Sequence, residues 1–160
     1  MIAQEQHRIP ESIQLRVVLL EAAFNSDELQ HDQNYAALTD PDLNLRILAT
    51  RSDADTSLCT WYPKAEELNF FAKGVVTALG GAGPSAQTLS DFASAGLAVS
   101  VGPGFTYKGI VTNADRLVVA NLTPLHDANP GHVTSKFSGH HSDIHYNEIY
   151  ELIAGFLFRQ

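Results

Sequence analysis

The stretch LRILATRSDAD, residues 45–55, joins a run of apolar and β-branched side chains directly to a turn that carries two aspartates. A short, continuous apolar run is typical of a strand that is buried on both faces of a parallel sheet. Similar runs occupy residues 15–20 and 116–122, and each ends where polar or small residues begin. The sequence therefore predicts an α/β fold, built on a partial, doubly wound and mostly parallel sheet with flanking helices.

The segments between and after these strands predict the helices. Residues 63–79 are expected to form one helix, with Pro63 in its first turn and a Gly-Gly pair at residues 80–81 stopping it. A strand, helix, strand alternation implies a right-handed crossover between parallel strands. Residues 80–110 are rich in glycine, proline and small side chains, so we expect an irregular, loop-rich excursion with a short helix at 87–95 and a short strand at 97–101.

A final helix is predicted because four apolar residues near the end of the chain fall on one helical stripe, with Asn147 or Asp143 available as its cap. The four are Ile149, Leu152, Ile153 and Phe156.

Composition limits the classes of function. With 160 residues, 44% of them hydrophobic, the chain matches one globular domain. The net charge of −8 comes from scattered acids and disfavours phosphate backbones, so no nucleic-acid partner is expected. No apolar run approaches the roughly 20 residues of a membrane span, and the first residues do not resemble a signal peptide, so the default location is the cytoplasm. A single cysteine, Cys59, excludes an intrachain disulfide framework and is expected to be inert.

Two segments could carry chemistry, and each follows a predicted strand, where open α/β sheets place their ligand sites. The first is the turn with Asp53 and Asp55, whose carboxylates could orient an imidazole. The second is the loop at residues 138–145, which contains His140 and His141 ahead of the last helix. Histidine is the usual general base near neutral pH. A solvated acidic turn and a helix-capping surface loop are the alternative interpretations.

The order of these segments resembles the carboxyl-terminal half of the α/β-hydrolases, where an acid and then a histidine follow successive strands. VVLLEAAF at residues 17–24 resembles the strand and turn after the nucleophile helix of lipase- and esterase-like members. RILATRSDAD at residues 46–55 resembles their acid-bearing strand and turn. HSDI at residues 141–144, followed by Glu148, resembles their histidine segment.

This resemblance implies a single, incomplete domain over residues 1–160 that belongs to a serine hydrolase acting on carboxylic esters or lipids. Asp55 would be the triad acid and His141 the base, with Asp53 and His140 as the neighbours that a small error in alignment would implicate. No cofactor and no metal is implied. The substrate would be a small-molecule ester or lipid, and the chain would need a missing amino-terminal half as its partner.

The family's G-x-S-x-G nucleophile turn is absent from this sequence, and Ser85 and Ser138 lack its strand-to-helix context. The oxyanion-hole loop of the family would also lie upstream of residue 1. Because the nucleophile and the oxyanion donors supply most of the catalysis of acyl transfer, the chain alone is expected to be inactive.

Two other functions remain open. Histidines and acids gather in the second half of the chain and could bind zinc or iron, although their spacing matches no established metal motif. These residues are His126, Asp127, His132, His140, His141, Asp143 and His145. Alternatively, the chain could be a non-catalytic interaction module whose exposed first strand recruits another protein, including a separate half of a split enzyme.

Overall fold

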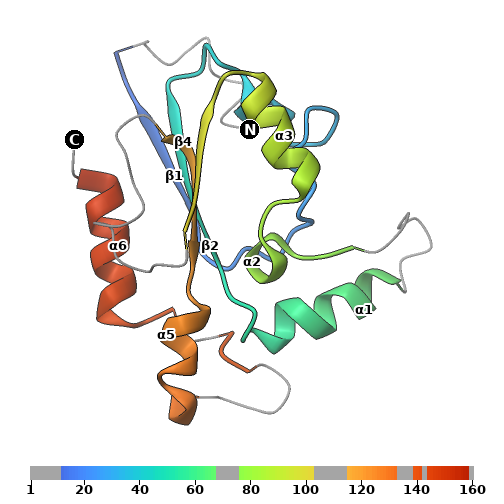
Figure 1. Cartoon of the computed structure of the whole chain (residues 1–160), viewed down its shortest axis with the longest axis vertical. Helices are drawn as coiled ribbons and strands as arrows, with labels where there is room; N and C mark the ends of the chain where they lie inside the picture. The colour runs from blue at the N-terminus through green and yellow to red at the C-terminus, as the bar shows by residue number, and fades with distance from the viewer. Residues whose placement is uncertain (1–11, 68–75, 103–114, 133–138, 142–143, 159–160) are drawn as a thin grey trace.

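A four-stranded, all-parallel sheet forms the centre of the molecule, so the predicted α/β fold is confirmed (Figure 1). The computed structural model describes residues 12–67, 76–102, 115–132, 139–141 and 144–158. The strands are β1 (Leu15–Leu19), β2 (Leu45–Arg51), β3 (Ala98–Gly102) and β4 (Asp115–Asn121). Their order across the sheet is β1-β2-β4-β3, which brings β4 beside β2 although β3 lies between them in the sequence.

All three long apolar runs form strands, and the short strand expected at residues 97–101 is present as β3. Leu15 pairs with Leu45, and Ile47 pairs with Leu117, so β1, β2 and β4 run side by side with their carboxyl ends at the same edge. Within the described sheet, β1 and β3 are the two edge strands. This common edge is where the acid turn and the histidine loop meet.

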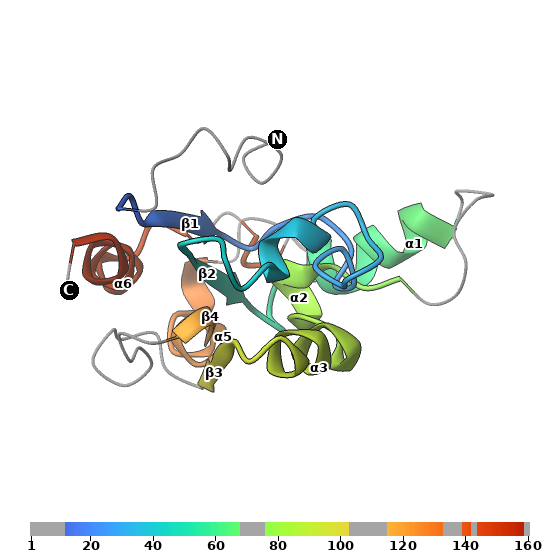
Figure 2. The same cartoon turned by 90° about the horizontal axis from the view of Figure 1, so that it is seen from above.

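Hydrophobic residues cover both faces of the sheet, as the continuous apolar runs predict. On one face, Ile47 and Leu117 pack with Leu79 and Phe92 from two short helices. On the other face, alternate residues of β2 and β4 pack against Leu152 and Phe156 of the last helix. The view from above shows these helices on opposite sides of the strands (Figure 2).

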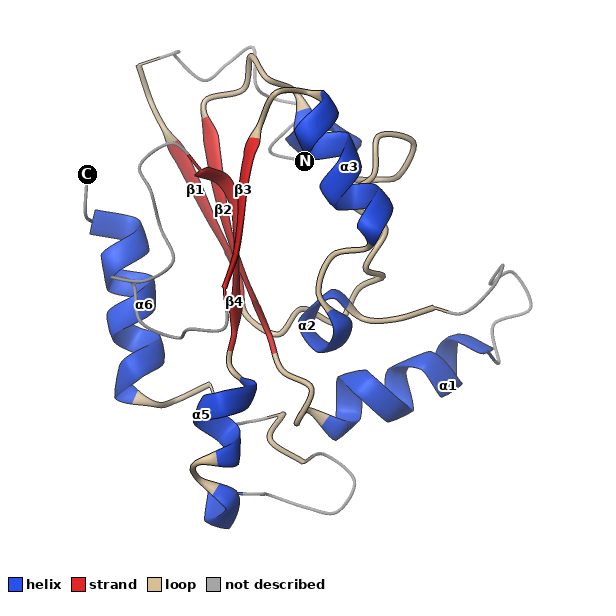
Figure 3. Ribbon diagram, viewed as in Figure 1, coloured by secondary structure: helices blue, strands red, loops and turns tan. Residues whose placement is uncertain are grey.

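The helices are α1 (Tyr62–Glu67), α2 (Leu79–Ala82), α3 (Ala86–Ser94), α5 (Thr123–Asp127) and α6 (Asn147–Phe158) (Figure 3). A π-helical turn, η3 (Ser57–Trp61), leads into α1, and the described part of the chain also contains the 3-10 turns η2 (Ala36–Thr39) and η4 (Pro130–His132). The helices expected at residues 87–95 and at the end of the chain are therefore present. Asn147 is the first residue of α6, whereas the other proposed cap, Asp143, lies outside the described residues.

The prediction of one helix over residues 63–79 was wrong at its carboxyl end. Residues 76–78 are not helical, and Ala78 is extended and forms an isolated antiparallel bridge with Asn25. The Gly-Gly pair lies inside α2 instead of ending a helix. The reason is packing, because a side chain at Gly80 would collide with the backbone of Glu21, so glycine is needed here for a close approach.

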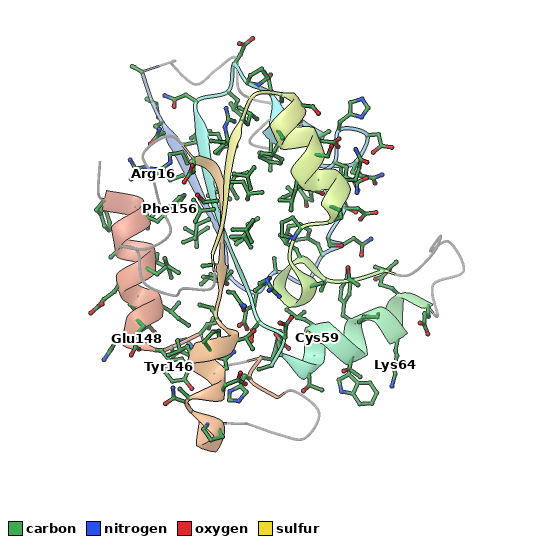
Figure 4. The ribbon with its side chains drawn as sticks, in the orientation of Figure 1. Arg16, Cys59, Lys64, Tyr146, Glu148 and Phe156 are labelled. Carbon is green, nitrogen blue, oxygen red and sulfur yellow. The ribbon has the colours of Figure 1, made fainter. Side chains whose placement is uncertain are left out.

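Arg16 connects the edge strand β1 to the end of α6. Its Nη1 donates hydrogen bonds of 2.6 and 2.9 Å to the carbonyl oxygens of Phe156 and Leu157 (Figure 4). These carbonyls belong to the last turn of α6, whose C=O groups lack partners within the helix. No helix in the described ranges is long and apolar enough to cross a bilayer.

Candidate active site

The acid turn begins where β2 ends and is held by its own hydrogen bonds. The amide of Asp55 donates to the carbonyl oxygen of Ser52, and the amide of Cys59 donates to the carbonyl oxygen of Asp55. The hydroxyl of Ser52 also accepts a hydrogen bond from the amide of Ala54 at 3.2 Å. These contacts turn the chain sharply and direct it into η3.

Asp55 is fully buried and both of its carboxylate oxygens accept hydrogen bonds. Oδ1 accepts from the backbone amide of Leu58 at 3.0 Å, and Oδ2 lies 2.7 Å from Nδ1 of His141. Because an ionised carboxylate can only accept, this bond requires the proton on Nδ1 of His141. The arrangement leaves Nε2 of the same ring as the basic nitrogen.

The histidine loop reaches the acid turn through close backbone contact. The amide of His140 donates to the carbonyl oxygen of Ala54 at 3.3 Å, and Gly139 adopts a positive φ of 56° beside Thr56. The side chain of His141 remains 42% exposed although its partner is buried. An imidazole that is oriented from one side and accessible from the other can exchange a proton with a bound molecule.

The structure separates the two aspartates and the two histidines that the sequence proposed. Asp53 has a side chain that is 60% exposed, and it accepts a hydrogen bond from Arg51 at 2.8 Å. His140 is buried, and its ring stacks on His126 with centroids 5.0 Å apart. The structure therefore brings together Asp55 and His141, and it gives Asp53 and His140 other contacts.

Two further residues at this edge were not proposed from the sequence as members of the acid–histidine site. Glu21 follows β1 and is buried, and it is the one non-glycine residue with a positive φ, 40°, in the described part of the chain. Its amide donates to Oγ1 of Thr50. Ser52 follows β2 and is also buried. Both lie just after a strand, so the rule that places ligand sites at strand ends could have identified them.

Ser52 and His126 form a second, fully buried pair, with 2.7 Å between Oγ and Nδ1. Nε2 of the same ring lies 3.8 Å from Oε1 of Glu21. Although serine, histidine and glutamate also occur together in hydrolases, these side chains are inaccessible to solvent. This second pair therefore cannot present a nucleophile to a substrate.

His141 makes one hydrogen bond within the described residues, to Asp55, and no serine is bonded to it there. Ser85 instead caps α3 by accepting a hydrogen bond from the amide of Thr88. Ser138 lies outside the described residues.

Cys59 lies close to the site but is a poor nucleophile. The residue is exposed overall, but partial burial of its thiol, together with the negative charges of Asp55 and Asp53, raises the pKa of the thiol to about 11. The thiol donates a hydrogen bond to the carbonyl oxygen of Ser52. Because the thiolate is the reactive form, the prediction that Cys59 is inert agrees with its surroundings.

The donor atoms of Glu21, Asp55 and His141 all lie within 4.8 Å of one another and could hold a metal ion. Within the described ranges this is the one such group, and it differs from the histidine-rich set considered from the sequence. Of that set, His126 and His140 stack on each other, and His145 is bonded to Tyr150. Asp143 lies outside the described residues.

No family model, curated protein or solved structure matches this chain. We therefore infer its function from the chemistry of the site.

Proposed function

We propose that this chain supplies the acid and the histidine of a serine hydrolase that acts on carboxylic esters or lipids. The observation that carries the proposal is the 2.7 Å contact between His141 Nδ1 and Asp55 Oδ2, made by a partly exposed imidazole and a fully buried carboxylate. In such a pair the acid fixes the tautomer of the histidine and stabilises the imidazolium that forms during acyl transfer.

In the proposed reaction, Nε2 of His141 removes the proton from a serine hydroxyl as that oxygen attacks the ester carbonyl. The same nitrogen then gives the proton to the leaving alkoxide, and water repeats the sequence to release the acid. Asp55 remains ionised throughout. The serine and the oxyanion donors would come from chain outside these 160 residues.

The sheet offers a place where such a segment could join. Of the described strands, β1 pairs with β2 alone, and each of its residues is only partly buried. Buried parallel strands seldom stand at an unprotected edge, because their unpaired backbone groups favour pairing with another strand. A preceding half of the domain that extends the sheet beyond β1 would cover this edge and bring its serine to the same end of the strands.

The test is ester hydrolysis by the protein joined to the segment that supplies the serine, with short-chain nitrophenyl esters as substrates. We expect Asp55→Asn to lower kcat by a factor on the order of 10⁴, because the amide no longer selects the required tautomer, and His141→Ala to lower it at least as much. Asp53→Asn and His145→Ala are the matched controls, since both residues are exposed and lie on the same two segments. Turnover like that of the wild type in Asp55→Asn or His141→Ala would contradict the proposal.

A second candidate function is the binding of a divalent cation by Glu21, Asp55 and His141. The observation in its favour is that one nitrogen and two carboxylate donors from three separate segments converge within 4.8 Å. Zinc, manganese or iron suits such a donor set. Calorimetric titration with zinc separates the two functions: tight binding that Glu21→Gln abolishes supports the metal site, whereas no heat of binding rejects it.

A further inference from the structure

His126 contacts both the segment that carries Asp55 and the segment that carries His141. Nδ1 of His126 is 2.7 Å from the hydroxyl of Ser52, the residue that begins the acid turn. The face of its ring stacks on His140, the neighbour of His141, with centroids 5.0 Å apart and the planes 7° from parallel. One side chain on α5 therefore connects two segments that are distant in sequence.

The hydroxyl of Ser52 links His126 to the acid turn through two hydrogen bonds. Oγ of Ser52 accepts a hydrogen bond from the amide of Ala54 and forms a second one with Nδ1 of His126, in which either atom can be the donor. Nε2 of the same ring lies 3.8 Å from Oε1 of Glu21. The residue after Ala54 is Asp55 itself, so the contact between Ser52 and His126 lies within the turn that carries the acid.

Burial prevents these groups from relaxing. His126, Ser52 and Glu21 are almost completely inaccessible, and the ring of Tyr146, which precedes α6, lies 6.1 Å from the ring of His126. In a buried network, a polar group that loses its hydrogen-bond partner cannot bond to water instead. The free-energy cost of that loss favours a single arrangement of the side chains. His126 consequently has no room to act as an acid or base toward a substrate.

We propose that His126 is a positioning residue for the acid–histidine pair. It fixes the acid turn through Ser52 and the histidine loop through His140, and it thereby holds His141 in the Nδ1–H tautomer against Asp55. This inference rests on the proposed function, because only a working acid–histidine pair gives this tautomer a catalytic use. Its test nevertheless needs no substrate.

The experiment measures the tautomer of His141 by its ring ¹⁵N chemical shifts in the ¹⁵N-labelled full chain. In water a free imidazole favours the proton on Nε2, so a population dominated by Nδ1–H reports the bond to Asp55. His141→Gln assigns the signal by removing it. We expect His126→Ala to lower the ratio of Nδ1–H to Nε2–H by roughly five- to tenfold, the amount that corresponds to the loss of about one hydrogen bond.

Two variants separate positioning from a general loss of structure. His126→Asn places an amide where the Nδ1 edge of the imidazole lies and can still bond to Ser52, so it should restore part of the tautomer ratio. Ser52→Ala removes the link to the acid turn while the His126 ring remains, and it should shift the ratio in the same direction as His126→Ala. His145 is an exposed histidine from the same region, so His145→Ala should leave the tautomer ratio of His141 unchanged.

The outcomes distinguish the two proposals. If the wild-type chain has no excess of the Nδ1–H tautomer, the Asp55–His141 pair does not form in solution, and the proposed function fails together with this inference. If the wild-type ratio is high and stays high in folded His126→Ala, only the positioning role is overturned. If His126→Ala does not fold, an unchanged ratio in Ser52→Ala overturns the positioning role instead.

Discussion

Gly139 lies so close to Thr56 that a Cβ at this position would be 2.5 Å from the Thr56 hydroxyl and 2.7 Å from the carbonyl oxygen of Ala54. This backbone approach brings the histidine loop onto the acid turn, two residues before His141. The φ of Gly139 is also positive, 56°, a conformation that side chains disfavour.

We therefore expect Gly139→Ala to destabilise the protein in two ways. The positive φ costs about 1–2 kcal/mol, and the forced separation of the two segments costs about 1–3 kcal/mol more. Gly96→Ala is the matched control, because Gly96 also has a positive φ, 71°, but a Cβ there meets nothing within 4 Å. Urea denaturation should show that Gly139→Ala lowers the free energy of unfolding more than Gly96→Ala does. Equal decreases would mean that the contact between Gly139 and Thr56 is not tight in solution.

The two aspartates of the acid turn should differ in their effect on stability. Asp55 is buried and accepts two hydrogen bonds, so Asp55→Asn should lower the free energy of unfolding by about 1–3 kcal/mol. Asp53 forms an exposed pair with Arg51, so Asp53→Asn should change it by less than about 1 kcal/mol. Chemical denaturation of both variants at neutral pH measures the difference, and a reversed order would show that Asp53 is the structural acid.

The positions of β2 and β4 could be predicted from the sequence because each contains a continuous apolar run, as expected for strands that are buried on both faces. The rule that places ligand sites at strand ends identified the acid turn and the histidine loop, whereas the choice of Asp55 and His141 within them came from the resemblance to the α/β-hydrolases. The strand, helix, strand pattern implied parallel pairing of the apolar runs that are now β2 and β4, and that pairing is present. The complete order β1-β2-β4-β3 was not predicted, because the pattern does not reveal that β3 lies outside β4.

Contacts over long sequence distances explain the remaining differences. Gly80 was expected to stop a helix, but its role depends on the backbone of Glu21, which lies on a different segment. His126 was considered only as a metal ligand, because nothing in its local sequence indicates contact with Ser52 and His140. Periodicity reports which side chains are buried, whereas it does not report which buried polar groups will be partners.

The raised pKa of Cys59 predicts slow alkylation in the folded protein. A shift from 9.0 to about 11 lowers the fraction of thiolate about 100-fold at neutral pH. The rate of reaction with iodoacetamide, measured by mass spectrometry, should rise about tenfold for each pH unit until the pH approaches the pKa. Asp55→Asn should accelerate the reaction because it removes a negative charge that disfavours the thiolate. A rate that stops rising below pH 9.0 would contradict the shift.

The link between Arg16 and α6 predicts how the edge strand is stabilised. Arg16→Ala removes two hydrogen bonds to the last carbonyls of the helix, and we expect a loss of about 1–3 kcal/mol in the free energy of unfolding. Arg16→Lys should recover only part of this loss, because an ammonium group does not reproduce the planar fork of guanidinium donors.

Lys64→Ala is the control, since Lys64 lies over the exposed ring of Trp61 and contributes at most about 1 kcal/mol (Figure 4). Urea denaturation compares the three variants. If Arg16→Ala costs no more than Lys64→Ala, then α6 is held by the packing of Leu152 and Phe156 on the sheet and not by its contact with β1.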